Sequence, residues 1–168
     1  MKNLLLTGRP GIGKTTLIVR LAQMLQDRRL AGFYTEEIRQ GPARAGFRVA
    51  TLSGQTATLA HRNIKSLQRV GQYFVDVSAF DQLVLPELAR PCKLILIDEI
   101  GKMECFSSRF VECVRELLGG TTSLIATVAL KGTGLIAEVK SRSDVEVVEV
   151  TRENRDELPR LLAKQTGG

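Results

Sequence analysis

Short apolar runs alternate with amphipathic stretches along this chain, and the alternation predicts a layered fold. Leu4 to Leu6 form an apolar run that reads as a short strand and ends at a glycine-rich segment. Behind that segment, apolar residues recur at helical spacing and predict an amphipathic helix over residues 14–28. A strand, a glycine loop and a helix in that order make half of a parallel β-α-β unit.

The alternation continues to the end of the chain. We predict further strands over residues 32–38, 47–52, 73–77, 93–97, 123–128 and 145–150. We predict further helices over residues 78–89, 108–118 and 135–140, and a last one entered near Pro159. Ser78 and Asp81 resemble a capping box at the start of the second helix. Residues 53–72 are polar and weakly patterned, so we expect mostly loop there.

These elements predict one three-layer α/β/α domain over residues 1–168. The continuous apolar run at 93–97 is typical of a central parallel strand that is covered on both faces, so the sheet should be mostly parallel. Gly41, Pro42 and Gly46 separate two strands and predict a β-hairpin insertion. A length of 168 residues suits a single domain, and 43% hydrophobic with 25% charged residues excludes a disordered or fibrous chain.

The net charge and the cysteines limit which partners, compartment and metal sites the sequence is compatible with. The net charge of +6 favours polyanionic partners, either nucleotides or nucleic acid. No apolar run reaches eighteen residues and no secretory signal pattern is visible, so we expect a cytoplasmic protein with no membrane association. Three cysteines without a CxxC pair predict reduced thiols rather than disulfides or a zinc site.

The glycine-rich segment carries the first chemical motif. Residues 8–15 fit G-x-x-x-x-G-K-[ST] in full, between a predicted strand and a predicted helix. Backbone N–H groups of such a loop cradle phosphate oxygens, Lys14 would bridge the β and γ phosphates, and Thr15 would offer its hydroxyl to Mg²⁺. The predicted nucleotide-binding residues here are Gly8, Arg9, Pro10, Gly11, Ile12, Gly13, Lys14, Thr15 and Thr16.

The second motif lies at the end of the apolar strand at 93–97. Asp98 and Glu99 follow that strand directly, at the sheet edge where ligands bind in open parallel sheets. Asp98 would hold Mg²⁺, and Glu99 would orient and polarise a water molecule for in-line attack on the γ-phosphoryl group. The predicted nucleotide-binding residues of this segment are Ile95, Leu96, Ile97, Asp98, Glu99, Ile100, Gly101 and Lys102.

The two motifs together predict a Rossmann-like P-loop NTPase fold. The long stretch between Lys14 and Asp98 leaves room for at least one strand between the two motif strands. With the added Glu99, this arrangement resembles the P-loop division of the RecA-like and AAA ATPases. Nothing remains for a helical lid or a ring interface, so we expect a compact, stand-alone enzyme that acts as a monomer.

Several segments carry a more specific resemblance, to the small P-loop nucleoside-triphosphatases known from thermophiles and their human cancer-related relative. They span almost the whole chain: residues 8–16, 32–39, 44–47, 70–73, 98–104 and 151–156, of which 98–104 is the most family-specific. The resemblance implies Mg²⁺-dependent hydrolysis of ATP, GTP, CTP and UTP to the diphosphate and phosphate. Cys105 departs from the larger apolar residue typical of the family, which should affect packing rather than catalysis.

Two roles at the site, the arginine that stabilises charge and the aromatic residue that stacks on the base, each have several candidates. A charge-stabilising arginine could come from Arg44, Arg48, Arg142 or Arg155, and a base could stack on Phe33, Tyr34, Phe47 or Tyr73. One rival function is a nucleotide or small-molecule kinase, against which Glu99 and the lack of an arginine-rich lid argue. Another is an NTP-switched regulator that binds nucleic acid, which no RNP, KH or helix-turn-helix signature supports.

Overall fold

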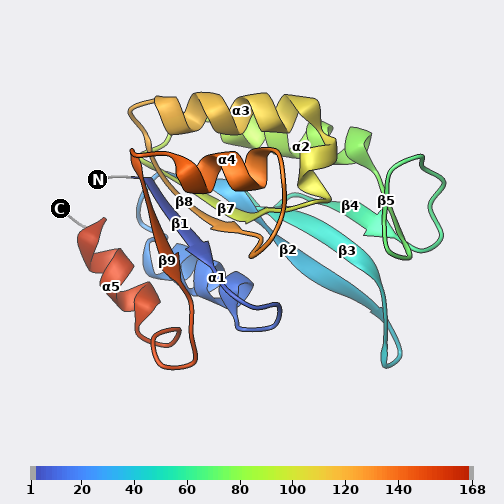
Figure 1. Cartoon of the computed structure of the whole chain (residues 1–168), viewed down its shortest axis with the longest axis horizontal. Helices are drawn as coiled ribbons and strands as arrows, with labels where there is room; N and C mark the ends of the chain where they lie inside the picture. Colours follow the sequence, from blue (N-terminus) through green and yellow to red (C-terminus); the bar gives the residue numbers. More distant parts are fainter. Residues whose placement is uncertain (1–2, 167–168) are drawn as a thin grey trace.

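The computed structural model describes residues 3–166 as one mixed sheet with helices on both of its faces (Figure 1). The strands are β1 (Asn3–Thr7), β2 (Leu30–Gln40), β3 (Ala43–Thr51), β4 (Thr56–His61), β5 (Arg69–Val70), β6 (Tyr73–Val75), β7 (Leu94–Ile100), β8 (Ser123–Val128) and β9 (Val145–Glu149). The helices are α1 (Lys14–Met24), α2 (Val77–Leu88), α3 (Ser108–Gly119), α4 (Leu135–Ser141) and α5 (Leu158–Gln165), with a 3₁₀ turn η1 (Glu104–Phe106) after β7.

Five strands form the parallel half of the sheet. In the sheet order β5-β6-β4-β3-β2-β7-β8-β1-β9, each neighbouring pair from β2 to β9 is parallel. Strand β8 therefore lies between β1, which leads into the glycine loop, and β7, which carries Asp98. The predicted three-layer architecture and the strand between the two motif strands are both confirmed.

The other half of the sheet is antiparallel and larger than the sequence predicts. The β2–β3 hairpin is present, but β4, β6 and β5 continue it by antiparallel pairing. The prediction that residues 53–72 are mostly loop was therefore wrong for β4 and β5. Figure 1 shows this half on the side of the molecule opposite β9, and we refer to β3, β4, β5 and β6 as the antiparallel extension.

Two cores lie on opposite faces of the sheet. On the face covered by α2, α3 and α4, the rings of Phe33, Phe80 and Phe110 meet edge to face with centroids 5.3 to 5.8 Å apart. Such aromatic contacts add to the stabilisation that burial alone provides. On the face covered by α1 and α5, Leu17 and Leu162 pack with apolar residues of β1 and β7.

Several element boundaries differ from the predictions, and three of the differences have a clear local description. Helix α1 ends at Met24 rather than Arg28. Helix α2 is capped by Asp76, whose Oδ1 accepts a hydrogen bond from the N–H of Ala79 over 2.9 Å, so the predicted capping box at Ser78 was wrong. Strand β7 runs on through Asp98 and Glu99 to Ile100, because its pairing with β8 resumes at Ile100 after a register shift.

Gly32 allows β2 to pass close to β7. A Cβ atom at this position would lie 1.8 Å from the carbonyl oxygen of Leu96, and the φ angle of +136° is one that side chains rarely adopt. The close pairing brings the following residues of β2 alongside the end of β7, where Thr35 meets Asp98. Among the described residues, no helix is long and apolar enough to cross a membrane.

Candidate active site

The glycine loop turns directly into the first turn of α1. Gly13 caps the helix with φ of 109°, a left-handed conformation that glycine adopts without steric cost. Lys14 is the first helical residue, and its Nζ folds back to donate a hydrogen bond to the carbonyl of Gly8 over 3.0 Å. The loop and the ammonium group thus enclose a small positively charged concavity at a helix N-terminus, the geometry that binds phosphate.

Asp98 is held in place by three hydroxyl groups from three different elements. Its Oδ2 accepts hydrogen bonds from Thr15 over 2.7 Å and from Thr35 over 3.3 Å, and its Oδ1 accepts one from Thr127 over 2.7 Å. The side chain is only 1% exposed. An oriented carboxylate next to a hydroxyl is an oxygen donor set of the kind that Mg²⁺ prefers. The predicted partners Thr15 and Asp98 are therefore side by side.

Glu99 extends toward the glycine loop from the same strand end. Its Oε2 lies 3.8 Å from Lys14 Nζ, and its side chain is 32% exposed, so it reaches solvent. Burial raises the pKa of the Glu99 carboxyl, the charge of Lys14 opposes this, and the charge of Asp98 adds to it. The site thus contains a partly desolvated carboxylate beside the lysine expected to contact phosphate.

Glu104 is a buried carboxyl group at this site to which the sequence reasoning gave no role. It is 5% exposed, and burial raises its pKa to about 8, with the charges of Glu99 and Asp98 adding to the shift. A Cβ atom on Gly101 would lie 2.9 Å from both Glu104 Oε2 and Glu99 Oε1. The missing side chain at Gly101 therefore leaves room for the two carboxyl groups to approach each other.

The predicted nucleotide-binding residues between 95 and 102 fall into two groups. The side chains of Ile95, Leu96, Ile97 and Ile100 are at most 2% exposed and belong to the two cores. They hold the strand that presents the carboxylates, and their side chains do not face the loop cavity. Lys102 is exposed and lines a cavity together with Glu99.

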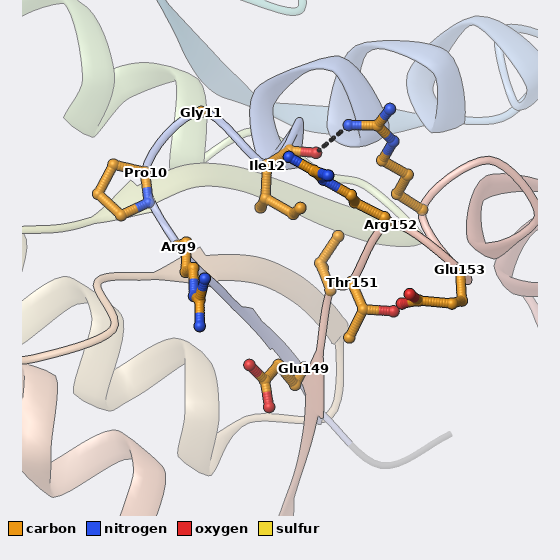
Figure 2. Close-up of a pocket in the computed structure, with 10 residues that line it drawn as sticks. Arg9, Pro10, Gly11, Ile12, Glu149, Thr151, Arg152 and Glu153 are labelled. Atoms are coloured by element: carbon orange, nitrogen blue, oxygen red, sulfur yellow. Dashed lines mark hydrogen bonds between the residues drawn. The ribbon is translucent and has the colours of Figure 1, made fainter.

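A cavity of about 560 Å³ lies beside the glycine loop (Figure 2). Arg9, Pro10, Gly11 and Ile12 form one side of it, and the end of β9 with the segment that follows forms the other, through Glu149, Thr151, Arg152 and Glu153 (Figure 2). Arg155 bridges the two sides, because one of its guanidinium nitrogens donates a hydrogen bond to the carbonyl of Ile12 over 3.2 Å. The cavity thus adjoins the glycine loop directly.

The open arginine candidates differ in what they contact. Arg44 pairs with Glu37, Arg48 pairs with Glu36 over 2.5 Å, and Arg142 pairs with Asp144 over 2.6 Å, all as surface ion pairs. Of these four arginines, Arg155 is the one with a hydrogen bond to the glycine loop.

The open aromatic candidates for base stacking lie away from that loop. Phe33 is fully buried in the core, and Phe47 meets Tyr73 edge to face in the antiparallel extension. Of the four candidates, none lines the cavity beside the glycine loop. In residues 3–166 the three cysteines are free, and no cluster of three or more His, Cys, Asp or Glu residues is arranged to hold a metal.

A phosphate-binding loop after β1, two carboxylates at the end of β7 and an intervening parallel strand define a P-loop NTPase domain. The chain belongs to the family described as NTPase, whose model matches residues 3–163.

Relatives and solved structures match over nearly their full lengths. The nucleoside-triphosphatase THEP1 of Thermotoga maritima is 40% identical over 158 residues, which cover 92% of this chain and 90% of that protein. The human cancer-related nucleoside-triphosphatase is 42% identical over 175 residues, which cover 94% of this chain and 92% of that protein. The crystal structure of THEP1 from Aquifex aeolicus superposes with a TM-score of 0.89 at 32% identity and covers 99% of both chains.

Proposed function

We propose that this protein hydrolyses nucleoside triphosphates to the diphosphate and phosphate, with Mg²⁺ and with broad tolerance of the base. The observation that carries the proposal is the convergence of two motifs: Thr15 bonds Asp98 over 2.7 Å while Glu99 lies 3.8 Å from Lys14. The related proteins named nucleoside-triphosphatases support the same activity.

The metal would be held by the hydroxyl of Thr15 and the carboxylate of Asp98. Both are hard oxygen donors, and the three hydroxyl contacts keep the Asp98 carboxylate in one orientation. When bound, Mg²⁺ supplies positive charge that neutralises the triphosphate and stabilises the charge that develops during transfer.

The other contributions to catalysis are the positioning of the reactants and the stabilisation of charge by residues of this chain. Backbone N–H groups of residues 8–15, apart from Pro10, and the N-terminus of α1 hold the phosphate oxygens, and Lys14 neutralises the terminal phosphates. Glu99 orients a water molecule and accepts its proton while the water oxygen attacks the γ-phosphorus. The bond to the bridging oxygen then breaks, and the diphosphate leaves with the bonding electrons.

Tolerance of the base follows from what lines the cavity beside the glycine loop. Its lining combines long charged side chains such as Arg9 and Arg152 with the backbone of the loop, and it holds none of the aromatic candidates. Flexible charged side chains can adapt to different base edges, whereas strong discrimination needs fixed and complementary hydrogen bonds.

We also propose that residues 1–168 act as a single-domain monomer in the cytoplasm. One continuous sheet carries both motifs, which suits a single domain. The three free cysteines suit a reducing compartment in which nucleoside triphosphates are abundant.

The test is phosphate release from ATP, GTP, CTP and UTP with no acceptor added, measured with Mg²⁺ and with EDTA. We expect the wild type to turn over all four in a Mg²⁺-dependent way. Lys14→Ala should weaken nucleotide binding, whereas Glu99→Gln should bind nucleotide but lose about 10²- to 10⁴-fold in turnover. Glu146→Gln, which changes an exposed carboxylate on β9, is the matched control and should behave as wild type.

Two results would contradict the proposal. Turnover of Glu99→Gln at the rate of Glu146→Gln would remove Glu99 from the chemistry. Binding of nucleotide by the wild type without release of phosphate would mean that hydrolysis is not the activity of this site.

A further inference from the structure

A second cavity, of about 300 Å³, lies where the antiparallel extension meets the end of β7. Phe47, Leu59 and Val70, from β3, β4 and β5, line one side of it. Glu99, Lys102, Met103 and Glu104 also line it, as does Lys131 from the segment after β8. We call this space the extension cavity.

The extension cavity borders the carboxylates at the end of β7 and is separate from the cavity beside the glycine loop. Of the residues that line it and the residues that line the cavity beside the glycine loop, none is shared. It includes Glu99, whose Oε2 lies 3.8 Å from Lys14, and Thr35, whose hydroxyl bonds Asp98. A molecule bound there would therefore face the terminal phosphate held by Lys14.

The residues that line the extension cavity indicate what kind of ligand it would bind. Its volume lies at the lower end of the range of about 300 to 1,000 Å³ that is usual for small-molecule sites, and apolar and polar or charged side chains contribute about equally to its lining. Lys102 and Lys131 are exposed, and in the described part of the chain neither forms an ion pair with a carboxylate. Two carboxyl groups share the lining, but Glu99 is paired with Lys14, and burial raises the pKa of Glu104 to about 8, so that Glu104 stays protonated at neutral pH. The two lysines therefore leave positive charge at the cavity for an anionic group of a ligand.

Hydrolysis alone gives no reason for the apolar side chains that line the extension cavity. A water molecule needs Glu99 and the phosphate site, but it does not need the apolar side chains of three further strands. Those strands belong to the antiparallel extension, and the proposed hydrolysis gives that extension no part in the reaction.

We propose that the extension cavity binds a small alcohol with an apolar body and an anionic group, and that the γ-phosphoryl group is transferred to its hydroxyl. This inference rests on the proposed function, because it uses the same phosphate site and the same Glu99. Glu99 alone favours water over an acceptor molecule, but a carboxylate that accepts a proton from water can also accept one from an alcohol, and the extension cavity supplies the acceptor site that the sequence does not reveal. The alcohol takes the place of the attacking water.

The transfer step balances without a further reactant. The alcohol oxygen forms a bond to the γ-phosphorus, and its proton passes to the Glu99 carboxylate. The bond between the γ-phosphorus and the β–γ bridging oxygen breaks, and the nucleoside diphosphate leaves with that electron pair. The products are a phosphate monoester and the diphosphate.

The test compares four alcohols as acceptors at equal concentration: methanol, butan-1-ol, benzyl alcohol and 4-(hydroxymethyl)benzoate. ³¹P NMR measures the ratio of phosphate ester to free phosphate formed from ATP. We expect this ratio to rise along the series and to be highest for 4-(hydroxymethyl)benzoate, which has an apolar ring and a carboxylate for the lysines. 4-Methylbenzoate, which lacks the hydroxyl, should compete and lower the ester formed from benzyl alcohol.

Two variants test whether formation of the phosphate ester depends on residues that line the extension cavity. Lys131→Ala should raise the concentration of 4-(hydroxymethyl)benzoate needed for half-maximal ester formation about fivefold, the effect of losing one partly exposed ion pair. Lys65→Ala removes an exposed lysine that does not line the cavity and is the matched control. It should leave the ester ratio unchanged.

The outcomes separate this inference from the proposed function. Release of phosphate with no ester from any alcohol, or with equal ester from all four, would overturn the acceptor site and leave hydrolysis intact. Ester formation without release of phosphate in the absence of alcohol would support the acceptor site and overturn hydrolysis. Formation of neither product would overturn both.

Discussion

Thr127 donates its hydroxyl hydrogen to Asp98 Oδ1 over 2.7 Å, in a place where neither side chain reaches solvent. Thr127 belongs to β8, which pairs with β7 on the side toward β1. Thr15 and Thr35 bond the other carboxylate oxygen. The orientation of the carboxylate that we assign to the metal is therefore set from β8 as well as from the glycine loop.

Replacing Thr127 by valine should show how much its hydrogen bond to Asp98 contributes, apart from the volume of its side chain. Thr127→Val keeps the volume but removes the donor to a buried carboxylate, so we expect a loss of about 1.5 to 3 kcal/mol in the free energy of unfolding. It should also raise the Mg²⁺ concentration needed for activity several-fold. Thr127→Ser keeps the hydroxyl and should leave the Mg²⁺ requirement unchanged, although its lost methyl group costs about 1 kcal/mol. Equal Mg²⁺ requirements for the two variants would count against this role.

Glu104 should make stability fall as the pH rises. Its pKa in the folded protein, about 8, lies above the ordinary value of 4.5, so the folded state keeps a proton that the unfolded chain has already released. The free energy of unfolding should therefore decrease between about pH 5 and pH 8, by at most about 1.4 kcal/mol per pH unit from this group. Urea unfolding without added metal measures the slope.

Glu104→Gln provides the comparison for that slope. The amide stays neutral at every pH, so the variant should gain stability relative to the wild type as the pH rises and should differ little from it near pH 5. If the stability difference between the two proteins is the same at each pH, Glu104 does not retain its proton in the folded state.

Gly32→Ala should be strongly destabilising. The new methyl group would collide with the Leu96 carbonyl at 1.8 Å, and neither backbone can move without breaking the β2–β7 pairing. We expect a loss of about 3 kcal/mol or more in the free energy of unfolding. Gly54→Ala is the control, because its φ is also positive at +94° but its Cβ would meet open space, and it should cost about 1 to 2 kcal/mol. Similar losses for both would show that steric contact with β7 is not the cause.

Arg155→Ala should affect nucleotide binding more than the chemical step. The side chain donates to Ile12 of the glycine loop, so its removal should raise the KM for ATP several-fold and change kcat little. Arg160→Ala, at an exposed position on α5, serves as the matched control for charge. A fall in kcat of about 10³-fold with an unchanged KM would instead make Arg155 the arginine that stabilises the transition state.

Elements with a local apolar pattern were predictable from the sequence, and elements stabilised by distant partners were not. The run at 94–97 is buried on both faces, and its composition alone predicts a central strand. In β4, only Leu59 and Ala60 are buried, so no alternation is visible. That strand exists because it pairs with β3 and β6, which a reading of residues 56–61 alone does not reveal.

The same distinction applies to the site. The glycine loop, Asp98 and Glu99 were predictable because phosphate binding needs particular residue types at fixed spacing next to a strand end. Thr35 and Thr127 carry no such pattern. They reach Asp98 only because β2 and β8 are the neighbours of β7 in the sheet. Likewise, the burial of Glu104 depends on the packing around the end of β7, which its place in the sequence does not indicate.

The two ends of the sheet differ in how they could recruit another chain. At one end, β5 has only two residues, Arg69 and Val70, so an incoming strand would find hardly any unpaired backbone to join. At the other end, β9 is longer, but Glu146 and Glu149 place negative charges along it. Because neither edge strand readily pairs with another chain, the sheet is protected against edge-to-edge aggregation. The protein should therefore remain dispersed at high concentration and during refolding.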